Sequence, residues 1–264
     1  VTPVDLRSAG YRGWMLPMDQ YLSHLDADAH LLAAAAARGL EATVPGCPDW
    51  SVADLLVHVA AVHSRTSDIV EQNLIGSWPA QAQLPEMGDP LQWYRAAASR
   101  LSQILAGADP ARPAKAFVDE QTVGFWIRRM AHETAVHRID AEQAHGYEST
   151  FDPELAVDGI AEVFDAFVTR IAGWGEYIPS GDVIRIQSGW QVWTVDLGHF
   201  VGSRGGRDYR IPKAKSIPDA EPTAVLSGEP DRVRLWMWGR APLHDVTVSG
   251  KIELAHQLRK VCSI

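Results

Sequence analysis

The sequence contains only two cysteines in 264 residues, Cys47 and Cys262, and they lie far apart along the chain. Two distant thiols cannot form the disulfide framework of a small secreted domain, so a reducing cytoplasm is the expected compartment. No apolar run approaches the roughly 20 residues that a membrane-spanning helix requires. The N-terminus also lacks a basic region followed by an apolar core, so we expect neither a membrane span nor a signal peptide.

Positive charge is scarce as well. The chain has 24 Lys and Arg against 33 Asp and Glu, which gives a net charge of −9. Nucleic-acid-binding domains carry an excess of basic residues, so we expect no nucleic-acid partner. Hydrophobic residues make up 46% and charged residues 22%, as in ordinary globular proteins, and the length allows one large domain or two modest ones. We expect a monomer or a homodimer.

The order of elements predicts two domains. Apolar periodicity predicts helices over residues 17–39, 51–74, 90–107, 120–146 and 153–173. Past Trp174 the pattern changes. It predicts short strands at 183–186, 192–195, 224–225 and 245–248, and helices at 229–240 and 251–261. We expect an irregular arm at 1–15, loops near 45–48 and 77–90, and a flexible basic segment at 202–218. The prediction is a helical bundle at 1–178 followed by a small α+β domain at 182–264.

One predicted helix carries polar residues on its core-facing side. Its inward stripe runs Trp126, Met130, Glu133, His137, and the last two are a carboxylate and an imidazole. Residues four apart on a helix lie about 40° apart around its axis, so Glu133 and His137 can grip one metal ion. His132 is five residues from His137 and faces elsewhere, so the pattern is not that of the zincins. A plain buried ion pair between Glu133 and His137 is the structural alternative.

A catalytic zinc commonly has three protein ligands and one open position. His58 is the best third candidate, because it shares the inward stripe of the second helix with Leu55 and Val62. The alternative for His58 is a hydrogen-bonded core histidine. His63 lies five residues further on, and we expect it at the surface or lining a pocket.

Two further residues have open interpretations. Asp140 follows His137 by three residues and either accepts its second imidazole N–H or forms a surface ion pair with Arg138 or with a neighbouring helix. Cys47 precedes a predicted helix N-terminus, where a thiolate is stabilised, but no base can be placed beside it. A packed thiol is the interpretation we favour for Cys47.

At these residues the chain resembles a known family. Residues 44–58, VPGCPDWSVADLLVH, and residues 132–140, HETAVHRID, resemble the two signatures of the mycothiol-dependent maleylpyruvate isomerase family, within the wider group of DinB-like metal-binding bundles. Residues 193–197 and 235–240 resemble its second domain, which is similar to sterol-carrier folds. The resemblance extends from about residue 17 onward, but segments 77–90 and 204–215 have no clear match.

The resemblance implies a ligand set of His58, Glu133 and His137, a divalent metal that is most often zinc, and mycothiol, the thiol of actinobacteria, as cosubstrate. It also implies a catalytic arginine in the second domain, for which Arg240 is the match; the alternative is an arginine that caps the preceding helix. The expected activity is addition of a thiolate to an electrophilic small molecule, in cis–trans isomerisation or S-transfer. The alternatives are a metal-dependent hydrolase, an iron oxygenase built on two histidines and a carboxylate, and a non-enzymatic metal-binding carrier module.

Overall fold

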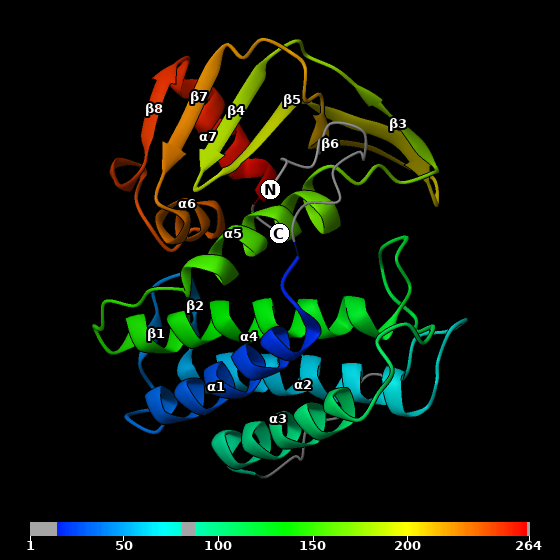
Figure 1. Ribbon diagram of the computed structural model, residues 1–264, viewed down its shortest axis with the longest axis vertical. Helices are drawn as coiled ribbons and strands as arrows, with labels where there is room; N and C mark the ends of the chain where they lie inside the picture. The colour runs from blue at the N-terminus through cyan, green and yellow to red at the C-terminus, as the bar shows by residue number, and fades with distance from the viewer. Residues whose placement is uncertain (1–14, 81–87, 263–264) are drawn as a thin grey trace, which may run out of the picture.

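The computed structural model describes residues 15–80 and 88–262, which form two layers (Figure 1). The lower layer in that view contains the long helices α1 to α4, and the upper layer contains the sheet with α6 and α7. The predicted class, a helical bundle followed by a small α+β domain, is confirmed. The arm predicted at 1–15 falls almost wholly outside the described residues, as do residues 81–87 of the loop predicted at 77–90.

The four long helices lie close to the ranges that apolar periodicity predicted: α1 (Met18–Ala36), α2 (Val52–Glu71), α3 (Pro90–Ala106) and α4 (Val123–Ala144). Helix α1 packs chiefly on α4, and α2 packs chiefly on α3. Helix α4 is buried along most of its length, so its polar side chains need partners inside the protein. No helix within the described ranges is both long enough and apolar enough to cross a membrane.

Ser51 fixes the start of α2 through a capping box. Its Oγ accepts a hydrogen bond from the backbone N–H of Asp54 at 3.2 Å, and the Asp54 carboxylate accepts one from the backbone N–H of Ser51 at 2.9 Å. We expect Ser51→Ala to lower the free energy of unfolding by about 1 kcal/mol, because one helix N–H loses its partner. Urea denaturation measures this. Ser99→Ala, at an exposed position inside α3, serves as the control, and an equal loss in both variants would contradict the role of the cap.

The segment around Pro45, predicted as a loop, forms a small hairpin. Strands β1 (Thr43–Val44) and β2 (Cys47–Ser51) pair antiparallel, with Pro45 and Gly46 between them. Strand β1 contacts α4, so the hairpin lies against the bundle just before α2 begins (Figure 1). This position brings Cys47 and Trp50 to the cavity described below.

Helix α5 (Pro153–Glu162) joins the two layers and continues into a π-helical turn, Val163–Val168, instead of reaching residue 173 as predicted. Side chains of α5 belong to both hydrophobic cores, that of the bundle and that of the sheet. Leu155 packs with the bundle, whereas Ile160 packs with the sheet. The domain limits of 1–178 and 182–264 stay a prediction.

The sheet has six strands: β3 (Gly175–Ile178), β4 (Val183–Ser188), β5 (Gln191–Arg204), β6 (Arg207–Ser216), β7 (Ala224–Gly228) and β8 (Thr247–Gly250). The long strand β5 pairs with β3 and β4 and also with β6, and the order continues from β4 through β7 to β8. Only β4 and β7 run parallel to each other. Helix α6 (Pro230–Trp238) lies between β7 and β8 in the chain, and α7 (Ile252–Cys262) packs its apolar stripe on the sheet core.

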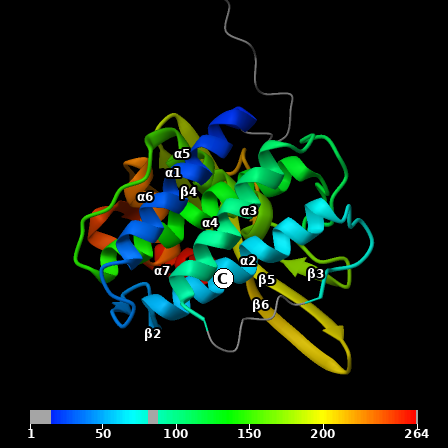
Figure 2. The ribbon, with the colours of Figure 1, turned by 90° about the horizontal axis from the view of Figure 1, so that it is seen from below.

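The flexible segment predicted at 202–218 is wrong, because these residues form the end of β5 and all of β6. The turn between the strands is Gly205–Gly206, and both glycines have positive φ, at 60° and 74°. A two-residue turn of this kind matches the right-handed twist of a hairpin, and its positive φ values favour glycine, which has no Cβ. Three of the four basic residues of β6, Arg207, Lys213 and Lys215, then lie on one face of a paired strand, and Arg210 lies on the other. Figure 2 shows this hairpin projecting beyond the helices.

A buried polar network ties α1, α4, α5 and α6 together. The carboxylate of Asp158 accepts hydrogen bonds from Tyr21 at 2.6 Å and from Arg128 at 3.0 Å, and it lies 2.7 Å from Nε2 of His132. On the other side of the His132 ring, Nη2 of Arg234 donates to Nδ1 at 3.0 Å. All of these side chains are buried, so the network replaces the water that each group has lost.

Candidate active site

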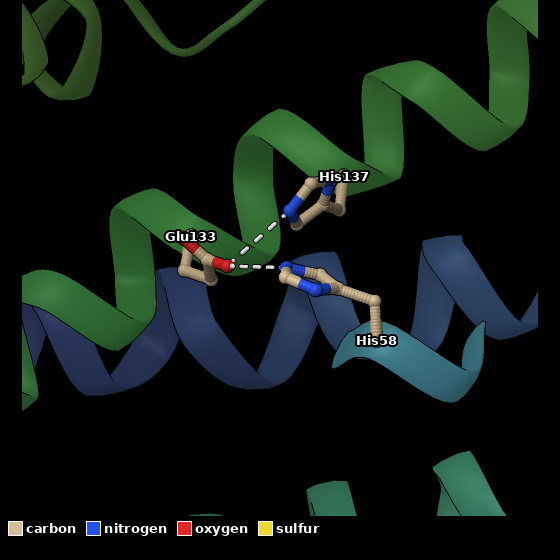
Figure 3. A group of neighbouring side chains, drawn as sticks. All are labelled: His58, Glu133 and His137. Carbon is tan, nitrogen blue, oxygen red and sulfur yellow. Dashed lines mark hydrogen bonds and ion pairs between the residues drawn. The ribbon is translucent and has the colours of Figure 1, made fainter. Parts of the chain in front are cut away.

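The three predicted ligand residues meet between α2 and α4. The Nε2 atoms of His58 and His137 each lie 3.3 Å from Oε1 of Glu133, and one ligand atom from each residue lies within 4.8 Å of the others (Figure 3). The imidazole rings of His58 and His137 face each other edge-on, with centroids 5.1 Å apart. The structure therefore brings together the three residues that spacing and burial selected. We call them the triad.

The two helices run antiparallel where the triad forms. His58 lies level with Glu133 and His137, whereas Thr66, further along α2, contacts Met130, which comes earlier on α4. The triad is only partly covered: the side chain of His58 is 38% exposed, against 14% for Glu133 and 10% for His137. The open side of the triad is therefore the side of His58.

Glu133 is held as an anion. Burial would raise the pKa of its carboxyl, but the guanidinium of Arg129 and the hydrogen bonds from His137 and His58 outweigh burial and hold the pKa well below its usual range. Arg129 donates to Oε2, and its other arm donates to Glu162 at 2.6 Å. Oε1 remains for the imidazoles or for a cation. The role of Arg129 was not predicted from the sequence, although an arginine four residues before a glutamate on one helix is a visible pairing signal.

Asp140 links His137 to the second domain. Its Oδ2 accepts from Nδ1 of His137 at 2.9 Å, and both carboxylate oxygens accept from Arg240, each at 2.8 Å. Of the two interpretations of Asp140, the structure supports the imidazole partner, because Arg138 pairs with Asp28 and Glu142 instead. With Nδ1 bonded to Asp140, Nε2 is the nitrogen of His137 that is directed at the centre of the triad, and it can bind a cation once its proton is lost.

The same bonds control protonation of His137. Burial would lower its pKa, but the hydrogen bonds to Asp140 and Glu133 outweigh burial and raise the pKa to about 9. In the metal-free protein a proton therefore bridges His137 and Glu133 at neutral pH. A cation that binds at the triad has to displace this proton.

The triad forms part of the wall of a cavity of about 500 Å³. One end of the cavity is formed by Cys47 and Arg240, whose Nη2 lies 3.5 Å from the cysteine sulfur. Burial raises the pKa of Cys47 in spite of this arginine, which favours a packed thiol over a nucleophile. Gly46 leaves room for the pair behind it, since a Cβ there would lie 2.8 Å from both Arg240 and Asp140.

Arg240 fits both of its predicted interpretations. It donates to the carbonyl of Trp238 at 2.5 Å, as an arginine that caps α6 would, and it also reaches Asp140 across the domain contact. Its side chain lines the cavity beside the triad. Whether it takes part in catalysis stays a prediction.

Two other histidines of the bundle lie away from the triad. His132 turns to Asp158, as its spacing from His137 led us to expect. The surface or pocket-lining position predicted for His63 is wrong: His63 is fully buried, and its Nε2 lies 3.0 Å from the hydroxyl of Thr134. The reason is tertiary, because α3 covers this side of α2 and the Tyr94 ring packs on the imidazole.

The burial of His63 predicts a pH-dependent stability. Burial lowers its pKa from 6.5 to about 4, so between these values the unfolded chain binds a proton that the folded chain does not. The free energy of unfolding should therefore fall as the pH falls from 6.5 towards 4. From this residue we expect a loss of about 2 kcal/mol between pH 7 and pH 4.5.

Urea denaturation at the two pH values measures this loss, and His63→Gln provides the comparison because glutamine keeps a polar partner for Thr134. The variant should lose about 2 kcal/mol less than the parent over the same pH interval. An identical pH dependence in both proteins would show that His63 titrates normally.

Comparisons with known proteins agree with this architecture. A protein-family model, described as the mycothiol maleylpyruvate isomerase N-terminal domain, matches residues 23–142. A second family model, that of the C-terminal domain of the same family, matches residues 154–257. Two crystal structures of mycothiol-dependent maleylpyruvate isomerase, one of a histidine-to-alanine mutant, have TM-scores of 0.58 and 0.56. Each is 14% identical in sequence, and each match covers 89% of this chain and 95% of the other. No curated protein gives a significant match.

Proposed function

Because this chain belongs to the mycothiol-dependent maleylpyruvate isomerase family, we propose that it is a metal-dependent enzyme that uses mycothiol to add a thiolate to an electrophilic small molecule. The reaction is an isomerisation of a cis double bond or an S-transfer. The observation that carries the proposal is the triad of His58, Glu133 and His137, whose donor atoms converge at the wall of a cavity. The two free thiols suit a reducing cytoplasm.

The residues present fit a divalent cation. Two imidazole nitrogens and one carboxylate oxygen converge, and the carboxylate is an anion with Oε1 directed at both rings. Two histidines and one carboxylate form a known catalytic zinc set that keeps an open position. No fourth Cys, His, Asp or Glu joins this group within the part of the chain that the structure describes. This argues for a catalytic site over a closed structural one.

A divalent cation at the triad would deprotonate a thiol that coordinates it, so that a thiolate forms at neutral pH. The residues of the chain have their own tasks. Asp140 holds the His137 ring and Arg129 holds Glu133, so both ligands are oriented before a cation arrives. Arg240 is our proposed catalytic residue, because it lines the cavity and its one remaining N–H, on Nη1, can stabilise an enolate oxygen.

A hydrolase finds less support. A metal-dependent hydrolase uses a general base that is not itself a ligand of the metal. Among the described residues that line the cavity, Glu133 is the only carboxylate, and it belongs to the triad. The iron-oxygenase alternative is tested by the identity of the metal in the purified protein, with zinc as the expected result.

The test of the proposal is direct binding of the thiol. Cobalt-substituted protein is titrated with mycothiol, and we expect a thiolate-to-cobalt absorption band that saturates below millimolar thiol. The S-methyl derivative of mycothiol, which cannot form a thiolate, is the matched control. If neither compound changes the spectrum at millimolar concentration, mycothiol is not the cosubstrate.

A further inference from the structure

The cavity is lined by four arginines, and three of them form hydrogen bonds with other described residues. Arg129 binds Glu133 and Glu162, Arg240 binds Asp140, and Arg259 donates to two backbone carbonyls of α6. Arg65 makes no hydrogen bond or ion pair with any residue in the described part of the chain. Its guanidinium is therefore available to an anion from solution.

Arg65 lies at the opposite end of the cavity from Arg240. It follows His58 on α2 by seven residues, which is two helical turns and about 10 Å along the axis. Helix α4 runs the other way, so Trp126, seven residues before Glu133, lies towards the same end as Arg65. The triad thus lies between two arginines of the cavity. Arg240 at one end is paired with Asp140, whereas Arg65 at the other end can bind an anion.

The wall beside Arg65 is aromatic. Phe117 packs on Trp126 and on Phe167, with ring centroids 6.1 Å and 5.5 Å apart, and all three rings line the cavity. Val62 and Met130 extend this surface towards the triad. A short dicarboxylate would gain little from such a wall, whereas a flat apolar body would bury its surface against it.

From this arrangement we infer that Arg65 selects the second substrate, and that this substrate is a carboxylate with an aromatic or extended apolar body. The carboxylate pairs with the guanidinium of Arg65, the body lies along Phe117 and Trp126, and the electrophilic carbon reaches the triad. The inference rests on the proposed function, since it concerns the electrophile that the thiolate attacks. Arg65 acts as a specificity residue, because it holds the end of the substrate that does not react.

Binding of two matched probes tests the inference. 4-Acetylbenzoate and 4-acetylbenzamide share an acetyl-substituted ring and have nearly the same shape, but the first ends in an anionic carboxylate and the second in a neutral carboxamide. In the zinc-loaded protein at low salt, we expect calorimetry to give at least about tenfold tighter binding of 4-acetylbenzoate, as a charge-assisted hydrogen bond provides. In Arg65→Gln the ratio should fall to about one, with binding of the amide unchanged. Arg95→Gln, which removes an exposed charge from α3, should keep the parent ratio.

Other outcomes would overturn the inference. If Arg65→Gln leaves the ratio unchanged, the carboxylate does not bind Arg65. If maleate, a short dicarboxylate without an apolar body, binds as tightly as 4-acetylbenzoate, the aromatic wall does not favour substrates with an apolar body. Metal content and mycothiol binding of Arg65→Gln are measured in parallel, and both should equal the parent values. If the parent protein itself bound neither metal nor mycothiol, the proposed function would be refuted. A preference for the carboxylate probe that depends on Arg65 would still show that this arginine binds the anion.

Discussion

Replacing His137 by alanine should remove most of the metal from the protein. The parent, loaded with zinc and dialysed, should retain roughly one ion per chain, since three ligands suffice for a catalytic zinc site. His137 supplies one of these ligands and is the only one whose ring is fixed by a buried carboxylate. Removal of an outer partner of a ligand typically costs 10–100-fold in affinity, so loss of the ligand itself should cost more than about 100-fold.

Elemental analysis after dialysis against a chelator of known affinity measures this effect. His256→Ala, at an exposed position on α7, is the control for non-specific binding by histidine and should retain the parent metal content. Thermal unfolding of each metal-free protein separates ligation from folding. If His137→Ala keeps its metal while it stays folded, the ligand assignment is wrong.

The second large effect concerns stability and not the triad. Asp158→Ala should lower the free energy of unfolding by about 3–5 kcal/mol, because it removes the fully buried anion that pairs with the guanidinium of Arg128. Burial would raise the pKa of Asp158, but His132 and Arg128 outweigh burial and hold it below its usual value, so the carboxylate is ionised. Without it, Arg128 keeps only Asp165 as a side-chain partner, and the Tyr21 hydroxyl loses its acceptor.

Urea denaturation measures the loss, and the thermal midpoint should fall by about 10 °C, given a shift of 2–4 °C per kcal/mol for chains of this size. Asp26→Asn, at an exposed position on α1, is the control for removal of a negative charge. Because Asp158 does not touch the triad, zinc should still bind to the folded variant. A loss below about 1 kcal/mol would mean that the network contributes little beyond the packing around it.

The core of the candidate site could be predicted because it is local. Glu133 and His137 share one face of one helix by their spacing alone, and the apolar neighbours Trp126 and Met130 show which face is turned inward. His58 was a weaker inference, since only its place on an apolar stripe indicated it. Asp140 was undecided for a different reason: helical spacing allows the bond to His137 but does not choose between it and a surface pair.

Long-range partners could not be predicted in this way. Asp140 and Arg240 are 100 residues apart, and Arg234 reaches His132 across 102 residues. The direction in which His63 points became clear only when α3 was seen to cover it. The error at 202–218 differs in kind, because the glycine pair at the turn was visible in the sequence. A composition rich in glycine, proline and basic residues indicated a flexible segment, although the same glycines allow a tight hairpin turn.

By itself, the sequence determined the class of the fold and the face of α4 that carries a carboxylate and an imidazole, because helical periodicity depends only on backbone geometry and on the burial of apolar side chains. Only the tertiary structure decided between the two interpretations of His58, by bringing its ring to Glu133 and His137, and only it joined Asp140 to Arg240. It also decided that Arg65 is the cavity arginine left without a hydrogen bond or ion pair among the described residues. The physical reason is that the pairing of buried charges depends on which helices pack together, and residues distant in the chain meet only when the apolar surfaces around them are buried.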